Sequence, residues 1–157
     1  MKPKLYLEST IPSYLVARPS RDVILAGQQK CTRDWWSKRA GSFEIFVSEV
    51  VVQEVASGEP AMAARRMTLI KPFAQLESNS AVKELTRALV HGGPLPEKAA
   101  RDAAHIALAA VHGMHFLLTW NCTHIANAMM FAKMREICAA HGFDCPVICT
   151  PDELLAK

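Results

Sequence analysis

The sequence has no long apolar run, and this absence excludes two classes of protein. A membrane-spanning helix needs about 20 mostly apolar residues, and a secretory signal peptide needs an uninterrupted apolar core behind its basic residues. Here the apolar stretch that follows Lys2 and Lys4 already ends at Glu8. We therefore expect neither a membrane span nor a signal peptide, and we predict a cytoplasmic protein.

The cysteines show neither a pairing pattern nor a metal-binding pattern. They are odd in number and form neither a C-x-x-C pair nor a His/Cys cluster with the spacing of a zinc site. Their positions are Cys31, Cys122, Cys138, Cys145 and Cys149. We expect reduced thiols, which agrees with an intracellular protein.

Strong net charge, internal repeats and long linkers are also missing. The formal net charge is only +3, while 50% of the residues are hydrophobic and 21% are charged. A chain of 157 residues with this balance can bury a core without disulfides or structural metal. The sequence therefore predicts a single domain over residues 1–157.

One segment departs from the weak overall charge. Between Arg18 and Arg39 there are six basic and two acidic residues, and the segment contains the pair Trp35-Trp36. Aromatic rings beside cations can stack the bases of single-stranded nucleic acid, although a charged run is more often one solvated helix face. Neighbouring helical residues point about 100° apart, so we expect Trp35 in the core and Trp36 at a partly exposed surface.

Hydrophobic periodicity and turn residues predict helices in alternation with strands. Helices are expected to begin at Thr10 and to span 22–40, 48–58, 61–70, 80–90, 97–112 and 125–140. Strands are expected at 4–8, 43–47, 115–120 and 146–150. The stretch before Glu77 is ambiguous and includes a candidate for a short edge strand. Such alternation predicts an α/β fold with a mostly parallel sheet of four to five strands, flanked by helices.

Polar residues stand where two of these strands end, which is where ligands bind in parallel sheets. Glu8 follows the first strand, and Asn121 follows the strand at 115–120. The simpler interpretations are a turn carboxylate for Glu8 and a helix N-cap for Asn121.

Two further carboxylates lie on predicted helices and face inward. Glu54 lies three and four residues after Val51 and Val50, and Asp102 stands on an alanine-rich helix. A buried carboxylate must meet a cation, several hydrogen-bond donors or a metal. Arg101 points about 100° away from Asp102 around the helix. Satisfaction by arginine or backbone is one possibility, and a hard divalent cation such as Mg²⁺ or Mn²⁺ is the other.

These residues fall into four motifs, which occur in the order Tyr6 to Thr10, Ser48 to Glu54, Asp102 to Ala109, and Leu117 to Asn121 with His124 beyond it. In order and spacing they resemble the PIN-domain family of metal-dependent nucleases, to which the VapC-type toxins of bacterial toxin–antitoxin pairs belong. The resemblance covers essentially the whole chain and implies a three-layer sandwich with a parallel central sheet.

The resemblance also implies a function and a set of site residues. By position, Glu8, Glu54 and Asp102 would be metal ligands, Asn121 would take the place of a fourth acid, and Thr119 would be the hydroxyl beside it. The implied activity is cleavage of RNA by water activated on Mg²⁺ or Mn²⁺. The implied partners are an RNA substrate, a cognate antitoxin and a second copy of the chain.

Two positions differ from the family pattern, which has aspartate in place of Glu8 and usually in place of Asn121. The first change lengthens the side chain by one methylene and the second removes a charge, so we expect weak metal affinity, with one bound ion as an alternative to two. The alternative function is a PIN-fold module that binds RNA or protein and has little or no nuclease activity.

Several other side chains have a structural and a functional interpretation. His105 and His124 are expected mainly to hydrogen-bond residues of the site rather than to act directly. An apolar surface is expected on the helix at 125–140, and it serves either homodimer contact or burial on two sides. Its members are Met129, Met130, Phe131 and Met134.

Overall fold

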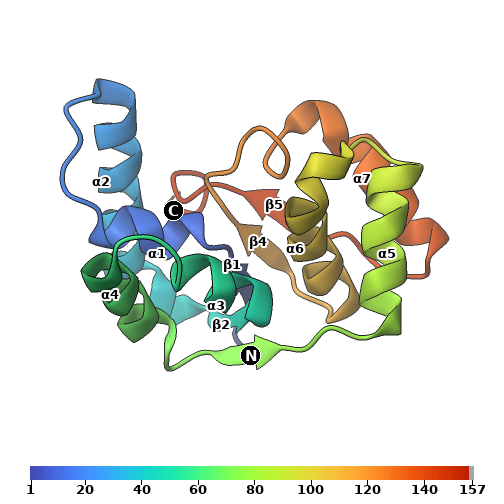
Figure 1. The fold of residues 1–157 in the computed structure, drawn as a ribbon, viewed down its shortest axis with the longest axis horizontal. Coiled ribbons are helices and arrows are strands. Elements are labelled where there is room, and N and C mark those ends of the chain that lie inside the picture. Colours follow the sequence, from blue (N-terminus) through green and yellow to red (C-terminus); the bar gives the residue numbers. More distant parts are fainter. Residues whose placement is uncertain (156–157) are drawn as a thin grey trace.

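The computed structural model describes residues 1–155 and has a five-stranded sheet between two sets of helices (Figure 1). The strand order is β3-β2-β1-β4-β5, and each neighbouring pair is parallel. The strands are β1 (Lys4–Leu7), β2 (Glu44–Ser48), β3 (Ala74–Leu76), β4 (Phe116–Leu118) and β5 (Val147–Cys149). The predicted α/β fold is confirmed, and β3 is the short edge strand that the sequence left open.

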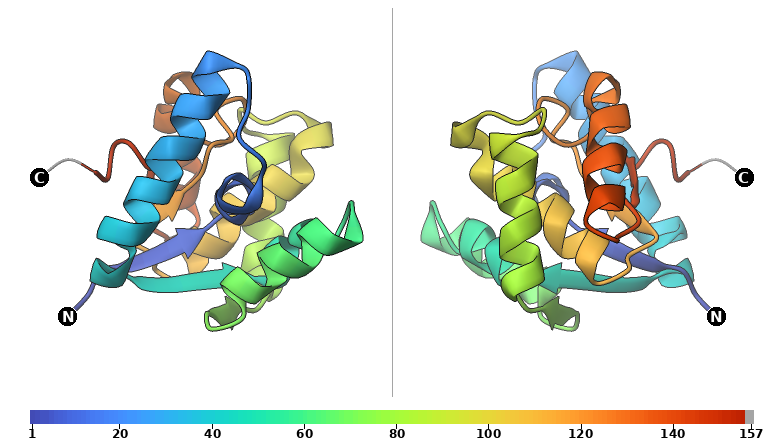
Figure 2. Two further views of the ribbon diagram at one scale, coloured as in Figure 1. Left: turned by 90° about the vertical axis from the view of Figure 1, so that its left-hand side faces the viewer. Right: turned by 90° about the vertical axis from the view of Figure 1, so that its right-hand side faces the viewer.

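Helices cover both faces of the sheet. In the described part of the chain they are α1 (Thr10–Val16), α2 (Val23–Lys38), α3 (Glu49–Val55), α4 (Pro60–Ile70), α5 (Ser80–His91), α6 (Ala100–Val111) and α7 (Phe131–Ala140). Helices α1 to α4 gather on one side in Figure 1, and α5 to α7 gather on the other. In Figure 2, α2 and α4 face the viewer in the left panel, and α5 and α7 do so in the right panel.

The order of the strands places a topological switch between β1 and β4. From β1 the chain moves outward through β2 to β3, and it then crosses to the opposite side of β1 to form β4 and β5. Parallel connections are almost always right-handed, so this reversal puts the later helices on the other face. The loops after β1 and β4 therefore diverge, and a crevice opens at their carboxyl ends.

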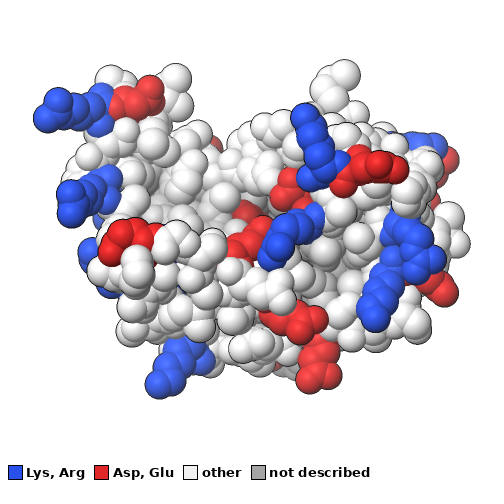
Figure 3. Space-filling model, viewed as in Figure 1, with Lys and Arg blue, Asp and Glu red and all other residues white. Residues whose placement is uncertain are grey.

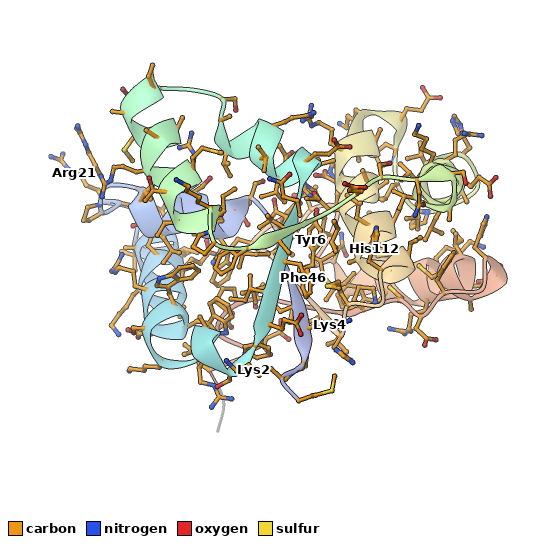
Figure 4. The ribbon with its side chains drawn as sticks, turned by 90° about the horizontal axis from the view of Figure 1, so that it is seen from below. Lys2, Lys4, Tyr6, Arg21, Phe46 and His112 are labelled. Carbon is orange, nitrogen blue, oxygen red and sulfur yellow. The ribbon has the colours of Figure 1, made fainter. Side chains whose placement is uncertain are left out.

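The core follows from the burial of the central strand on both faces. Leu5, Tyr6 and Leu7 of β1 are all fully buried. Figure 4, which views the sheet from below, shows Tyr6 beside Phe46 of the neighbouring strand. It also labels His112, whose Nε2 lies 2.8 Å from the backbone oxygen of Glu77 and ties the end of α6 to the segment after β3.

The predicted helix over 125–140 is wrong in its first part. The segment after Asn121 forms turns, Ala128–Met130 is a short 3-10 helix, and α7 begins only at Phe131. The Asn127 side chain accepts a hydrogen bond from Met129 N (3.0 Å) and donates one to Thr123 O (2.9 Å). Asparagine side chains that bond nearby backbone groups compete with the helix, and the periodicity does not reveal this.

Smaller expectations are mostly met. Trp35 is fully buried and Trp36 is half-buried. The apolar surface at 129–134 is not one helix face, because Met134 is buried while Met129 is 92% exposed.

All five cysteines are free thiols. Among residues 1–155, no helix combines the length and the apolar character needed to cross a bilayer.

Candidate active site

Polar side chains from four segments meet at the carboxyl ends of β1 and β4. Glu8 follows β1, Thr119 and Asn121 follow β4, and helices α3 and α6 contribute Glu54 and Asp102. Figure 3 shows acidic side chains in the hollow at the middle of this face, with basic side chains nearby. The site thus lies at the switch point of the sheet, where ligands bind in α/β folds.

Glu8 is buried among hydroxyl groups. Only 3% of the residue is exposed. Its backbone N–H donates a hydrogen bond to Leu118 O (3.1 Å), which continues the pairing of β1 with β4. The Oε1 atom accepts hydrogen bonds from Thr10 and from Thr119 (2.6 Å), and Oε2 accepts one from Ser9 (2.8 Å). Two donors occupy Oε1, so Oε2 is the atom with capacity for a further ligand.

Ser9 bridges the two carboxylates of the site. Its Oγ lies 2.8 Å from Oε2 of Glu8 and 2.8 Å from Oε1 of Glu54. A serine hydroxyl has one hydrogen and can donate to only one of these oxygens at a time. In the other contact two oxygens face each other without a hydrogen between them, and this contact is repulsive. A cation between the two carboxylates would relieve that repulsion.

Glu54 is positioned by the short helix α3. Ser48 ends β2 and caps α3, because its side chain accepts from Val51 N (3.3 Å). Burial raises the pKa of Glu54, but hydrogen bonds from His105 and Ser9 and the charge of Arg101 outweigh it and hold that pKa below its usual value. The carboxylate of Glu54 is therefore ionised at neutral pH.

A buried chain of hydrogen bonds fixes the imidazole that contacts Glu54. His105 Nδ1 lies 2.6 Å from the Tyr6 hydroxyl, and that hydroxyl lies 2.8 Å from Ser48 Oγ. The ionised carboxylate of Glu54 can only accept a hydrogen bond. The Nε2 atom then carries the hydrogen that is donated to Glu54 Oε1 at 2.7 Å. Burial raises the pKa of Tyr6 well above its usual value, so this phenol stays neutral.

Asp102 and Asn121 form a second, separate pair of contacts. Oδ2 of Asp102 lies 2.9 Å from Nδ1 of His124. Asn121 Oδ1 accepts from the backbone N–H of His124 (3.1 Å), and Asn121 N donates to Thr119 Oγ1 (2.9 Å). The simpler interpretation of Asn121, a cap on the following turn, therefore describes its side-chain oxygen. Both histidines hydrogen-bond carboxylates of the site, as expected.

The structure brings together only part of the predicted ligand set. Within residues 1–155, the group close enough to share one ion consists of Glu8, Glu54 and His105, whose candidate ligand atoms all lie within 4.8 Å of one another. Asp102 does not belong to that group. Arg101, which points away from Asp102 around the helix as expected from the sequence, is instead a partner of Glu54, because its Nε lies 3.7 Å from Glu54 Oε2.

The residues at this position fit a divalent cation. Two carboxylates converge on one hydroxyl, and the site lacks the thiolates that favour zinc. In the present hydrogen-bond arrangement His105 Nε2 carries a hydrogen, so its role is to hold Glu54. The oxygens left to bind a metal are Glu8 Oε2 and the carboxylate of Glu54, which suit Mg²⁺ or Mn²⁺.

Comparison with known proteins places the fold. The sequence matches no protein-family model, and no curated protein is detectably similar to it. The structure is similar to the crystal structure of VapBC2 from Rickettsia felis bound to a DNA fragment from their promoter, with a TM-score of 0.59 and 12% identity. The match covers 94% of this chain and 98% of that chain. A parallel sheet in the order β3-β2-β1-β4-β5 between two helical layers, matched over nearly the whole chain, gives this protein a PIN-like fold.

Proposed function

We propose that the protein is a divalent-metal-dependent endoribonuclease and the toxin of a type II toxin–antitoxin pair. The observation that carries the proposal is the convergence of Glu8 and Glu54 on Ser9 at the switch point of a PIN-like fold. Carboxylates this close repel each other, and a bound Mg²⁺ or Mn²⁺ relieves the repulsion. Asp102, Asn121 and Thr119 stay in the proposed site, as the resemblance implies.

Each side chain has a distinct task in the proposed reaction. Glu8 and Glu54 would hold the metal, and Thr119 occupies Oε1 of Glu8 so that Oε2 keeps capacity for a further ligand. When bound, the metal would supply a hydroxide nucleophile from water and neutralise charge on the phosphodiester. Asp102 holds His124 at the rim of the hollow, where both side chains are about a fifth exposed, at 22% and 21%. Arg101 is 58% exposed and can turn from Glu54 toward a phosphate oxygen.

The structure gives a physical reason to expect weak metal affinity. The buried Glu8 already accepts hydrogen bonds from Thr10 and Thr119 and shares the Ser9 hydroxyl with Glu54. Arg101 already offsets part of the charge of Glu54. A metal must compete with these contacts. The same observations favour the alternative function, a PIN-fold module that binds RNA or protein without efficient cleavage.

Cleavage and metal titration together separate the two functions. We expect Mn²⁺-stimulated cleavage of a structured RNA by the wild type, a loss of that cleavage in Glu54→Gln and Asp102→Asn, and normal cleavage in Glu49→Gln. Glu49 is the matched control because it lies on the same helix and is exposed. Equal activity of all four proteins, or no calorimetric heat with millimolar metal, would refute the enzyme.

The proposed partners are an RNA substrate, an antitoxin and a second copy of the chain, all in the cytoplasm. Support for the antitoxin comes from the structural neighbour, which is named as a VapBC2 complex bound to promoter DNA. The simplest check is the gene context, where we expect a small open reading frame for a DNA-binding antitoxin directly upstream. Size-exclusion chromatography with light scattering tests the dimer.

A further inference from the structure

A second hollow lies away from the two carboxylates, between helices α1, α2 and α4. Its volume is about 430 Å³, and its lining includes Trp36 and Arg33 from α2, Arg65 from α4 and Leu15 from α1. The tryptophan is the half-buried member of the Trp35-Trp36 pair, which the candidate active site leaves unexplained. The hollow therefore combines one aromatic ring with two guanidinium groups.

The ring of Trp36 is held in a fixed orientation. It packs edge-on against Phe73, with centroids 6.0 Å apart and planes at 76°, and it also touches Trp35, with centroids 6.4 Å apart. These contacts fix the ring from the core side, while its remaining surface lines the hollow. A rigid, partly exposed aromatic ring is the kind of platform on which nucleic-acid bases stack.

The two arginines have no acidic partner in the described part of the chain. Both are exposed, and the one side-chain contact of Arg65 is a weak one with the sulfur of Met62, at 3.9 Å. Asp34, the acid next to Arg33 in sequence, is paired with Lys30 at 2.8 Å. Arg33 stands three residues before Trp36, so the two side chains share one face of α2. Their positive charge is available to an anion beside the ring.

The larger hollow between α3, α5 and α6 makes a useful contrast. It measures about 550 Å³, and its lining balances Lys83 and Arg87 with Glu49 and Glu97. The hollow lined by Trp36 has two basic residues and no acidic residue. Charge complementarity thus favours an anionic ligand in the Trp36 hollow.

Helix α1 connects this hollow to the candidate active site. The helix begins with Thr10, which donates to Glu8, and its last turn contributes Leu15 and Val16 to the hollow. Seven helical residues extend over about 10 Å. A strand of a few nucleotides can therefore pass along α1 from one site to the other.

We propose that the hollow binds one nucleotide of a single-stranded RNA, with its base stacked on Trp36 and its phosphate held by Arg33 and Arg65. The inference deepens the proposed function, since it takes RNA as the substrate and adds a site that grips the strand beside the cleavage point. Stacking accepts every base, so the site provides affinity for unpaired RNA rather than sequence preference.

Binding without metal tests the inference independently of cleavage. A fluorescently labelled single-stranded RNA oligonucleotide is titrated in EDTA, and its anisotropy gives Kd for the wild type, Arg33→Ala/Arg65→Ala, Trp36→Leu and Trp36→Phe. The matched control is Lys83→Ala/Arg87→Ala, which removes two exposed charges from the other hollow. Circular dichroism melting establishes that each variant is folded.

We expect the arginine pair and Trp36→Leu each to weaken binding about tenfold or more, while Trp36→Phe and the control stay close to the wild type. The arginine pair should also lower the slope of log K against log salt by about 0.7, the value for one phosphate contact on a single strand. Unchanged affinity in the pocket variants, or an equal loss in the control, overturns the inference and leaves the hollow to a protein partner.

The outcome is separable from that of the proposed function. If RNA binding depends on Trp36 but no RNA is cleaved, the RNA-binding role of the hollow is supported and the proposed nuclease activity is refuted. If cleavage depends on Glu54 but RNA binding is unchanged by substitution of Trp36, the nuclease activity is supported and the RNA-binding role of the hollow is refuted.

Discussion

The imidazole of His105 lies 2.7 Å from the carboxylate of Glu54, and His105 is fully buried while Glu54 faces the hollow. The contact joins residues 51 positions apart and is the last link of the chain that begins at Ser48. A buried imidazole with both nitrogens bonded cannot rotate freely, so Glu54 is held in one orientation before any ligand arrives.

Replacement of His105 by leucine should therefore destabilise the fold. The Tyr6 hydroxyl loses a hydrogen-bond partner and Glu54 loses a donor, and an unsatisfied buried polar group costs about 1–3 kcal/mol. We expect the free energy of unfolding, measured by urea titration, to fall by about 2 kcal/mol. His91→Leu is the control, because His91 is exposed at the end of α5, and an equal loss there would contradict the structural role of the chain.

Thr119 offers a test of how Glu8 is held. Thr119→Val keeps the shape of the side chain but removes the hydroxyl that lies 2.6 Å from Glu8 and accepts from Asn121 N. We expect a loss of about 1–3 kcal/mol in the free energy of unfolding and weaker Mn²⁺ binding by calorimetry. Thr119→Ser retains the hydroxyl and should recover metal binding. Two variants that behave alike would show that the hydroxyl does not matter.

Asn121→Asp should strengthen the proposed metal site. An aspartate can still accept from His124 N, as Asn121 does at 3.1 Å, and it restores the charge that the family pattern has at this position. We expect several-fold tighter binding of Mn²⁺ by calorimetry, because an added carboxylate raises the affinity of a site for hard cations. Unchanged or weaker binding would place Asn121 outside the metal site.

The raised pKa of Tyr6 predicts that the free energy of unfolding falls at alkaline pH. Its pKa in the folded state is raised above the usual 10.0, so the folded protein keeps the proton that the unfolded chain loses. The stability it contributes is fully present below about pH 10 and is lost as the pH rises further. Phenolate absorbance should therefore show that one of the two tyrosines ionises only together with unfolding. Tyr6→Phe should abolish that step, and its persistence would contradict the assignment.

The lowered pKa of Glu59 predicts that the free energy of unfolding falls at acid pH. Hydrogen bonds from the backbone of Ala61 and Met62 at the start of α4 lower the pKa of this exposed carboxyl below 4.5. Its contribution is present above that value and is lost as the pH falls through the folded-state pKa. Thermal melts of the wild type and Glu59→Gln should differ at neutral pH and converge at low pH. Parallel curves at all pH values would exclude the carboxylate as the cap.

The fold could be predicted from the sequence largely because its signals are local. The hydrophobic pattern identified β1, β2, β4 and β5 and left the edge strand β3 open, and Ser48 caps α3 as its residue type suggests. The segment after Asn121 was mispredicted because Asn127 bonds backbone groups in a way that periodicity does not encode. Helix α7 is consequently six residues shorter than expected at its start.

The candidate site could be predicted only in part. Helical spacing placed Glu54 toward the interior, but the sequence does not reveal that Ser9 bridges it to Glu8 or that Arg101 reaches it. These contacts join residues about 45 or more positions apart, and their geometry depends on the tertiary structure. The spacing of Asp102 and His105 placed both on the inward side of one helix, but it did not show that His105 contacts Glu54 or that Asp102 pairs with His124.

The switch between β1 and β4 also sets when the site comes into being during synthesis. Glu8 meets Thr119 across 111 positions of sequence, and β4 must pair with β1 before that contact exists. A nascent chain that has reached only β3 contains Glu8, Ser9 and Glu54 but lacks Thr119 and the imidazole of His105. During synthesis the site therefore cannot form until about three quarters of the protein has emerged from the ribosome. A product truncated before β4 contains Glu8 and Glu54 but cannot arrange them as in the folded protein.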